Sequence, residues 1–200
     1  MALKHILFDI DGTLINTRGA FLGALDAALG RKGIKCDDIL PYFSLPLADA
    51  VRDFGFTKAE YDEWNADYAH RLSEAPLYDG ADALIKKLYG GGVHMALVTS
   101  RKHDIAHIGL DGTGLLGYFD RIIAADDVPR PKPAPDPLLE YARGAGCTTD
   151  DMAFVGDSVH DKECAASAGV RFFAPGWATI ADELEGDAAS FDDILAAAGI

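Results

Sequence analysis

Short apolar runs alternate with helix-like stretches over the second half of the chain, and this alternation constrains the fold more than any other feature. Strands are expected at 93–98, 121–124, 152–155 and 170–174. Helices are expected at about 81–89, 102–110, 136–144, 159–168 and from 178 onward. Strands that alternate with helices form a parallel, doubly wound sheet with helices on both faces. The predicted fold class is therefore α/β.

A further strand is expected near the N-terminus, where the apolar run 6–8 stops at Asp9. From about residue 17 to 75 the pattern is helical, including a first helix at 21–29 and a short one at 48–54. Thr57 and Glu60 have the spacing of a capping box, which predicts that a third helix begins there.

This helical block separates the first strand from the second, although both belong to one sheet. We therefore interpret residues 17–76 as an inserted all-helical cap domain. Residues 1–16 and 77–200 are interpreted as the Rossmann-like core domain. Within the insertion, an aromatic stripe at helical spacing is expected to pack rather than to bind a ligand; its members are Tyr61, Trp64, Tyr68 and Leu72.

Charge and cysteine content exclude several classes of function. The formal net charge of −14 argues against binding to nucleic acid or to an anionic membrane, so an anionic substrate needs a local positive site. No apolar run approaches the length that spans a bilayer, and Asp9 interrupts the first one too early for a signal peptide. Three widely spaced cysteines suggest no disulfide framework. We expect a cytoplasmic protein, and the sequence does not indicate its oligomeric state.

Two aspartates follow the first strand. Asp9 and Asp11 are two residues apart, so an extended backbone would point both carboxylates the same way. Gly12 then allows the chain to turn, and Thr13 and Thr17 are expected to satisfy nearby backbone groups or to cap the next helix. Paired carboxylates repel each other unless a cation lies between them, and hard oxygen ligands favour Mg²⁺. The alternative is a solvated acidic turn.

Polar residues also follow the second strand and precede the helix at 136. Thr99 and Ser100 stand where a strand leads toward a helix, which suits a phosphate but equally suits a helix cap. Lys132 lies in the run 130–136 between prolines, and these prolines stiffen the chain around it. This lysine is either a positioned positive charge or a solvated side chain in a proline-rich loop.

The strand at 152–155 ends in Gly156 and Asp157, and Asp161 follows four residues later. Both carboxylates would face one site if a helix begins between them. The structural alternative assigns Asp157 or Ser158 to the helix cap and Asp161 to the first helical turn. In a parallel sheet all these strand ends meet at one edge, so the four groups are expected to converge.

In this order and placement, the groups Asp-x-Asp-Gly-Thr, hydrophobic-Thr-Ser, Lys-Pro-x-Pro and Gly-Asp-x-x-x-Asp resemble the four motifs of the haloacid dehalogenase superfamily. The resemblance covers nearly the whole chain and is greatest to the phosphoglycolate-phosphatase-like branch with a small helical cap. It implies a phosphatase that acts on a small phosphorylated metabolite. The second aspartate argues against dehalogenase activity, because the dehalogenases lack it.

The resemblance also implies a role for each matching residue. Asp9 would be the nucleophile that forms an aspartyl-phosphate, and Asp11 the general acid and base. Lys132 would neutralise charge, while Thr99 and the backbone of Ser100 would hold phosphate oxygens. The implied Mg²⁺ ligands are the side chains of Asp9 and Asp157 and the main-chain carbonyl of Asp11, with Asp161 in a supporting position.

The cap is expected to select the substrate. Arg18 and Ser44 are the candidate specificity residues, although a surface position for Arg18 is equally open and the family usually has glycine where Ser44 stands. Two other functions are kept beside the phosphatase. One is a sugar phosphomutase of the same family, which would return the phosphoryl group to the substrate. The other is a catalytically quiet protein that binds a phosphorylated ligand.

Overall fold

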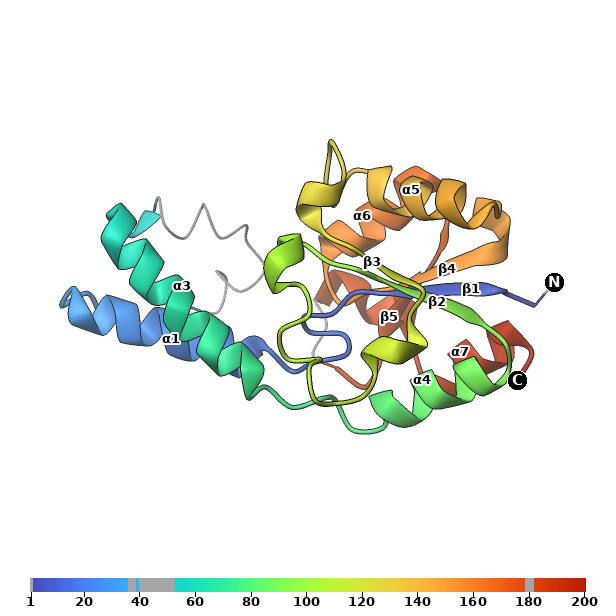
Figure 1. Ribbon diagram of the computed structural model, residues 1–200, viewed down its shortest axis with the longest axis horizontal. Helices are drawn as coiled ribbons and strands as arrows, with labels where there is room; N and C mark the ends of the chain where they lie inside the picture. Colours follow the sequence, from blue (N-terminus) through green and yellow to red (C-terminus); the bar gives the residue numbers. More distant parts are fainter. Residues whose placement is uncertain (1, 36–38, 40–52, 179–181) are drawn as a thin grey trace. The chain divides into compact units, whose positions relative to one another are not determined.

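The computed structural model describes residues 2–35, 39, 53–178 and 182–200. The chain divides into two compact units (Figure 1). Met1–Asn16 and Leu77–Ile200 make up the first, which we call the α/β unit. Thr17–Pro76 make up the second, which we call the helical unit.

Six parallel strands form one sheet in the α/β unit, in the order β3-β2-β1-β4-β5-β6. The strands are β1 His5–Phe8, β2 His94–Val98, β3 Arg121–Ile123, β4 Met152–Val155, β5 Arg171–Pro175 and β6 Ala188–Ala189. All four residues of β1 and of β4 are buried, as expected for central strands that are covered on both faces. The five longer strands confirm the predicted ones to within a residue or two.

Helices cover both faces of the sheet, which confirms the doubly wound α/β fold (Figure 1). One face carries α5 and α6, and the other carries α4 and α7. The four helices are α4 Ala81–Gly90, α5 Asp136–Ala145, α6 Val159–Ala168 and α7 Phe191–Ala198. Under α5 and α6 the core includes Leu7, Phe154, Tyr141 and the predicted core cysteine Cys164, all fully or almost fully buried.

Two predicted helices are wrong in the α/β unit. The segment 102–110 contains only a short 3₁₀ helix, η2 His103–Ile105, followed by turns up to Gly114. Gly109 takes a left-handed φ of 89°, which a continuous helix does not allow. The tail is also not helical throughout, because β6 interrupts it between the 3₁₀ helix η6 Asp182–Asp187 and α7. A two-residue strand is too short to leave a periodic pattern in the sequence.

Aromatic packing holds together the described part of the helical unit, which includes α1 Arg18–Arg31 and α3 Lys58–Ser73. Trp64 on α3 is 1% exposed and meets Phe21 of α1 edge-on, with ring centroids 5.9 Å apart. This confirms that the aromatic stripe packs. The capping box of Thr57 and Glu60 is also present. Thr17 precedes α1, but its side chain makes no capping hydrogen bond, so that prediction was wrong.

Several sequence predictions for the helical unit concern residues outside the described part of the chain. These are most of the short helix at 48–54 and the specificity candidate Ser44 with its loop. They remain predictions.

Candidate active site

The strand ends that carry the predicted motifs lie level with one another. Phe8 of β1 is paired in register with Leu97 of β2 and with Val155 of β4. Asp9 follows Phe8 directly, and its backbone N–H still donates to the carbonyl of Val155 at 2.9 Å. Side chains that follow these strands therefore emerge at the carboxyl edge of the sheet, where parallel α/β proteins bind their ligands.

The turn after β1 passes very close to the end of β4. Gly12 has a φ of 77°, and a Cβ atom built on it would lie 2.1 Å from Oδ2 of Asp157. Only glycine fits this approach and this backbone conformation. The next residue, Thr13, donates from Oγ1 to Oδ1 of Asp157 at 3.2 Å. The turn thus holds the Asp157 carboxylate beside β1.

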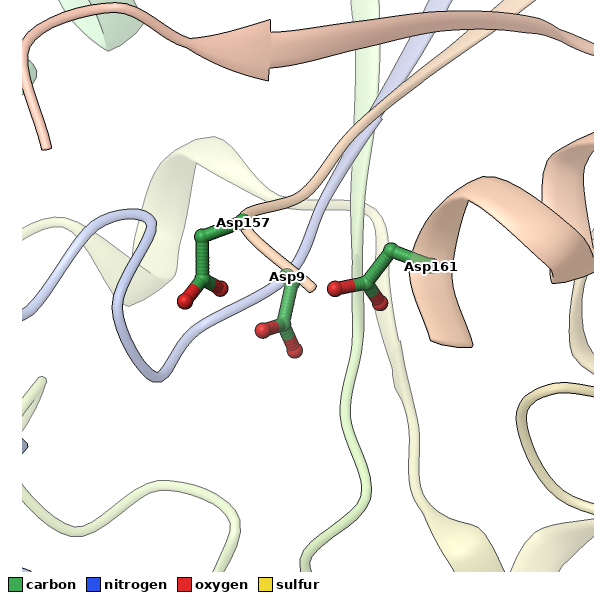
Figure 2. Close-up of side chains that lie close together, drawn as sticks. All are labelled: Asp9, Asp157 and Asp161. Atoms are coloured by element: carbon green, nitrogen blue, oxygen red, sulfur yellow. The ribbon is translucent and has the colours of Figure 1, made fainter. Parts of the chain in front are cut away.

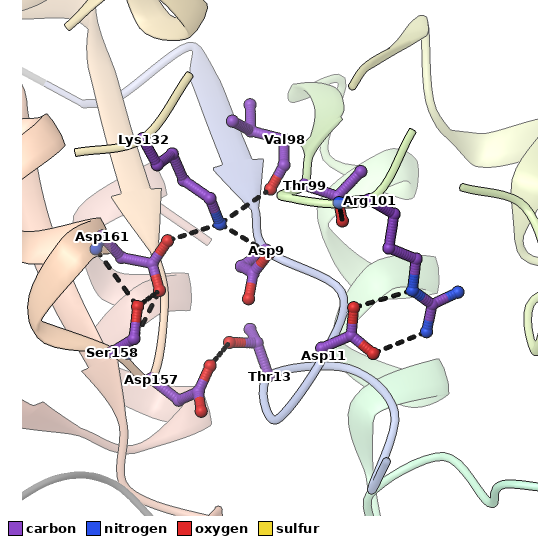
Figure 3. Close-up of polar contacts among 10 residues, drawn as sticks. All are labelled: Asp9, Asp11, Thr13, Val98, Thr99, Arg101, Lys132, Asp157, Ser158 and Asp161. Carbon is purple, nitrogen blue, oxygen red and sulfur yellow. Dashed lines mark hydrogen bonds and ion pairs between the residues drawn. The ribbon is translucent and has the colours of Figure 1, made fainter. Parts of the chain in front are cut away.

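Lys132 is buried, not solvated. Its side chain is 3% exposed, and its Nζ donates to Oδ1 of Asp9 at 2.8 Å and to Oδ1 of Asp161 at 2.7 Å (Figure 3). The Lys132–Pro133 peptide bond is cis. The surroundings of this lysine therefore match its interpretation as a positioned positive charge. Lys132 is 123 positions from Asp9 and 29 positions from Asp161 in the sequence.

Asp161 fits both interpretations that the sequence left open, because it lies in the first turn of α6 and also faces Lys132. Its Oδ2 accepts hydrogen bonds from the backbone N–H and the hydroxyl of Ser158, which completes the N-terminal cap of α6. Its Oδ1 accepts the hydrogen bond from Lys132. Gly156 makes room for this arrangement, because a Cβ there would lie 2.5 Å from Cβ of Asp161. The helix cap therefore also orients Lys132.

We call Asp9, Asp157 and Asp161 the acidic cluster (Figure 2). Burial raises the pKa of Asp9 from its usual 3.8 to about 7; Lys132 opposes this, while Asp161 and Asp11 add to it. Burial and the Asp9 charge likewise raise the pKa of Asp157 well above its usual value. Although burial acts in the opposite direction, Asp161 and Asp9 raise the pKa of Lys132, so it stays charged. If all three buried carboxylates were ionised, they would outnumber the one ammonium beside them.

This excess of charge fits a bound cation. One oxygen from each carboxylate of the acidic cluster can be chosen so that all three lie within 4.8 Å of one another. Carboxylates are hard donors, which Mg²⁺ prefers. A divalent cation would lower the pKa values of Asp9 and Asp157, because it stabilises their ionised forms. The residues present therefore fit a Mg²⁺ ion.

The Asp11 side chain does not point the way that its spacing from Asp9 predicted. Its carboxylate is turned toward Arg101 and away from Lys132 (Figure 3). The reason is that β1 ends at Phe8, so the alternation of an extended strand no longer applies at Asp11. The pairing of Asp11 with Arg101 was therefore not predicted, and a joint action of Asp9 and Asp11 remains a prediction.

The remaining site candidates lie in different parts of the chain. Thr99 follows β2 and is buried, and its Oγ1 accepts a hydrogen bond from the backbone N–H of Arg101 at 3.1 Å. Ser100 beside it is exposed. Arg18 is the first residue of α1 in the helical unit. The roles of these residues remain predictions.

Two residues near the acidic cluster were missed in the sequence. Arg101 comes directly after Thr99 and Ser100, and a charged residue at a strand end was the available signal. Trp177 follows β5, and its indole Nε1 donates to the carbonyl of Thr13 at 3.1 Å. No sequence pattern indicated this contact, because it joins residues 164 positions apart.

Comparison with known proteins identifies the family. The profile of the family described as haloacid dehalogenase-like hydrolase matches residues 6–174, which is most of the chain. The chain therefore belongs to this family and is a phosphatase-type hydrolase. The acidic cluster at its carboxyl edge is consistent with the magnesium site of such enzymes.

Among individual proteins, the chain is similar to the "Putative pyrophosphatase PpaX" of Caldanaerobacter subterraneus subsp. tengcongensis. The two are 32% identical over 193 residues, covering 92% of this chain and 86% of the relative. The pyrophosphatase PpaX of Halalkalibacterium halodurans is also 32% identical, over 188 residues that cover 89% of this chain and 86% of that protein.

Among solved structures, the chain resembles a "putative phosphoglycolate phosphatase" from Lactobacillus plantarum, with a TM-score of 0.83 and 27% identity. The match covers 98% of this chain and 100% of that one. Concerning membranes, no helix in the described part of the chain is long and apolar enough to cross a bilayer.

Proposed function

We propose that the protein is a magnesium-dependent phosphatase that hydrolyses a small phosphorylated metabolite through an aspartyl-phosphate on Asp9. The observation that carries this proposal is the buried bond from Lys132 to Oδ1 of Asp9, within a cluster of carboxylates that needs a further cation. Phosphoryl transfer requires a nucleophile and concentrated positive charge around the phosphate oxygens. Lys132 and the proposed Mg²⁺ would supply that charge.

The residues that would hold the ion are Asp9 and Asp157 through their side chains and Asp11 through its main-chain carbonyl. When bound, Mg²⁺ supplies positive charge to the phosphate and to the attacking carboxylate. Asp161 supports the site indirectly, since it fixes Lys132. Thr99 accepts a hydrogen bond from the Arg101 N–H, so its own O–H proton remains to be donated to a phosphate oxygen. The exposed Ser100 would contribute its backbone N–H.

The reaction proceeds in two steps. First, a carboxylate oxygen of Asp9 bonds to phosphorus while the bond from phosphorus to the leaving oxygen breaks, and Asp11 donates a proton to that oxygen. Asp11 then takes a proton from water, whose oxygen bonds to phosphorus as the bond to Asp9 breaks. Inorganic phosphate leaves, and the Asp9 carboxylate and the Asp11 proton are restored.

The helical unit is the proposed cap, with Arg18 and Ser44 as the candidates for substrate contact. The names of the relatives point to two substrates, pyrophosphate and phosphoglycolate, both of which are small and carry two anionic groups. Such substrates suit a protein of net charge −14 only if positive charge is concentrated at the site, as it is at Lys132.

The test is phosphate release in the presence of Mg²⁺ with pyrophosphate, phosphoglycolate, sugar phosphates, nucleotides and p-nitrophenyl phosphate. Asp9→Asn and a chelator should each abolish turnover, whereas the exposed Asp192→Asn should leave it unchanged. An isomerised sugar phosphate without free phosphate would instead identify a mutase. Tight binding of a phosphorylated ligand without turnover would identify a binding protein.

A further inference from the structure

Arg101 binds the carboxylate of Asp11 through two hydrogen bonds. Its Nε donates to Oδ2 at 2.7 Å and its Nη2 donates to Oδ1 at 2.6 Å (Figure 3). The Arg101 side chain is 6% exposed and that of Asp11 is 25% exposed. A planar guanidinium that meets a carboxylate through two parallel bonds fixes both its position and its rotation.

Backbone carbonyls of the segment after β2 also bind the Arg101 guanidinium. Nη1 of Arg101 donates to the carbonyl of Ile108 at 2.6 Å and, more weakly, to that of Ile105 at 3.5 Å. An α-helix over 102–110, as the sequence predicted, would direct the Ile105 carbonyl to the amide of Gly109. In the turns found there, the Ile105 carbonyl also accepts from the N–H of Ile108 at 3.2 Å, so the stronger carbonyl partner of the guanidinium is Ile108.

The backbone of Arg101 is fixed as well. Its N–H donates to the hydroxyl of Thr99 at 3.1 Å, and its carbonyl accepts from the N–H of Ala125 at 2.9 Å. The guanidinium is therefore tied to the ends of two neighbouring strands, β2 and β3. All of these partners lie in the α/β unit.

We propose that Arg101 is a positioning residue, which holds the Asp11 carboxylate at the place from which it exchanges protons with the substrate. This inference rests on the proposed function, in which Asp11 is the general acid and base. Arg101 acts through Asp11 and need not touch the reacting phosphate. In the first step, which kcat/KM reports, its loss should therefore impair only those substrates that need a proton from Asp11.

The test compares two kinds of substrate at one fixed pH. The alkyl phosphate hydrolysed best in the panel needs a proton on its leaving oxygen, whereas p-nitrophenyl phosphate releases a stable phenolate without one. We expect Arg101→Met to lower kcat/KM for the alkyl phosphate by about 10- to 100-fold and for p-nitrophenyl phosphate by less than about threefold. The ratio between the two substrates does not depend on the fraction of enzyme that is folded.

Three further variants give the test its controls. Arg101→Lys keeps one charged bond to Asp11, so it should recover part of the alkyl phosphate activity. Arg143→Met removes an exposed arginine that pairs with Glu140 on α5, and it should change neither substrate. In the Asp11→Asn background, Arg101→Met should cause little additional loss, because two residues that act as a unit do not contribute additively.

The outcomes separate this inference from the proposed function. Equal losses on both substrates in Arg101→Met, or a gain on the alkyl phosphate, would overturn the positioning role. If Asp11→Asn is selective for the alkyl phosphate and Arg101→Met is not, only the inference fails. If Asp11→Asn itself impairs both substrates equally, the assignment of Asp11 as the acid fails, and the inference fails with it.

Discussion

The two edges of the parallel sheet satisfy their polar groups in different ways. At the carboxyl edge, two of the three carboxylates of the acidic cluster, Asp9 and Asp161, share Lys132, whereas Asp157 accepts a hydrogen bond from Thr13. At the amino edge, His5 and His94 begin β1 and β2 and stack with ring centroids 5.1 Å apart. Each histidine there has its own partner: Tyr141 for His5 at 3.0 Å and Asp120 for His94 at 2.9 Å.

This difference separates the part of the sheet that we propose binds a ligand from the part that we expect only to stabilise the fold. A cluster of like charges that the fold cannot neutralise is a binding site for an ion of opposite charge. A polar group with one well-placed neutral partner, as His5 has in Tyr141, contributes only the modest net free energy of that bond. Substitutions at the two edges should therefore differ in size, in pH dependence and in their effect on turnover.

The largest effect is expected from Lys132→Met. With Lys132 removed, the acidic cluster keeps three buried carboxylates and no ammonium, which should lower the free energy of unfolding by about 3–5 kcal/mol at pH 8. Turnover should fall by about 10²–10³-fold, because the phosphate loses a positioned charge. Urea unfolding followed by circular dichroism measures the first change, and phosphate release measures the second.

The matched control for this variant is Lys86→Met. Lys86 also pairs with an aspartate, Asp82, but its side chain is 53% exposed, so its removal should lower the free energy of unfolding far less than that of Lys132. The decrease in the free energy of unfolding caused by Lys132→Met should also become smaller toward pH 5, where the carboxylates take up protons. A stability at pH 8 equal to that of the unmodified protein would contradict the view that Lys132 is needed to compensate buried charge.

Residues at this edge could largely be predicted from the sequence, because their signals are local. Asp9, Thr99 and Asp157 each follow an apolar run, and Lys132 lies between prolines. The fold was predictable for the same reason, since each main strand is a short apolar run between helical patterns.

Features that depend on distant partners could not be predicted. The direction of Asp11 is set by Arg101, which is 90 positions away in the sequence. The turns that replace the expected helix at 102–110 are likewise tied to a distant group, because the backbone N–H of His103 donates to Asp126 at 2.8 Å. The strand β6 exists only through its pairing with β5. Local sequence patterns carry no information on such pairs.

An intermediate effect is expected from magnesium, and it should depend on pH. Burial raises the pKa of Asp9 to about 7, so without metal the folded protein binds a proton that the unfolded chain releases above pH 3.8. This contribution to stability is full below pH 3.8 and is lost as the pH rises through about 7. Magnesium binds the ionised carboxylates, so its stabilising effect should be larger at pH 8 than at pH 6.

The measurement is the thermal midpoint in excess Mg²⁺ and in chelator at both pH values. An ion present at a hundred times its dissociation constant stabilises the folded state by about 2.7 kcal/mol. Asp157→Asn should abolish this gain, because it removes a proposed ligand whose pKa is also raised. An equal gain at pH 6 and pH 8 would show that the ion binds elsewhere.

The smallest effect is expected at the amino edge, from Tyr141→Phe. This change removes the hydroxyl beside Nδ1 of His5 and keeps the ring that packs under α5, so the loss should be about 0.5–1.5 kcal/mol. Burial lowers the pKa of His5, with His94 acting in the same direction, so the folded state favours neutral His5. Its contribution to stability is full above pH 6.5 and is lost as the pH falls through the lowered pKa of the folded state.

The pH dependence at this edge therefore has the opposite sign to that of Asp9. Urea unfolding of Tyr141→Phe at pH 8 and at pH 5.5 measures the loss in the free energy of unfolding, and Tyr89→Phe, at an exposed tyrosine, is the control. Phosphate release should be unchanged in both variants, because the amino edge takes no part in the proposed reaction. A loss of turnover in Tyr141→Phe comparable to that in Lys132→Met would break the distinction between the two edges, since it would couple a stabilising hydrogen bond to the chemistry at the far end of the strands.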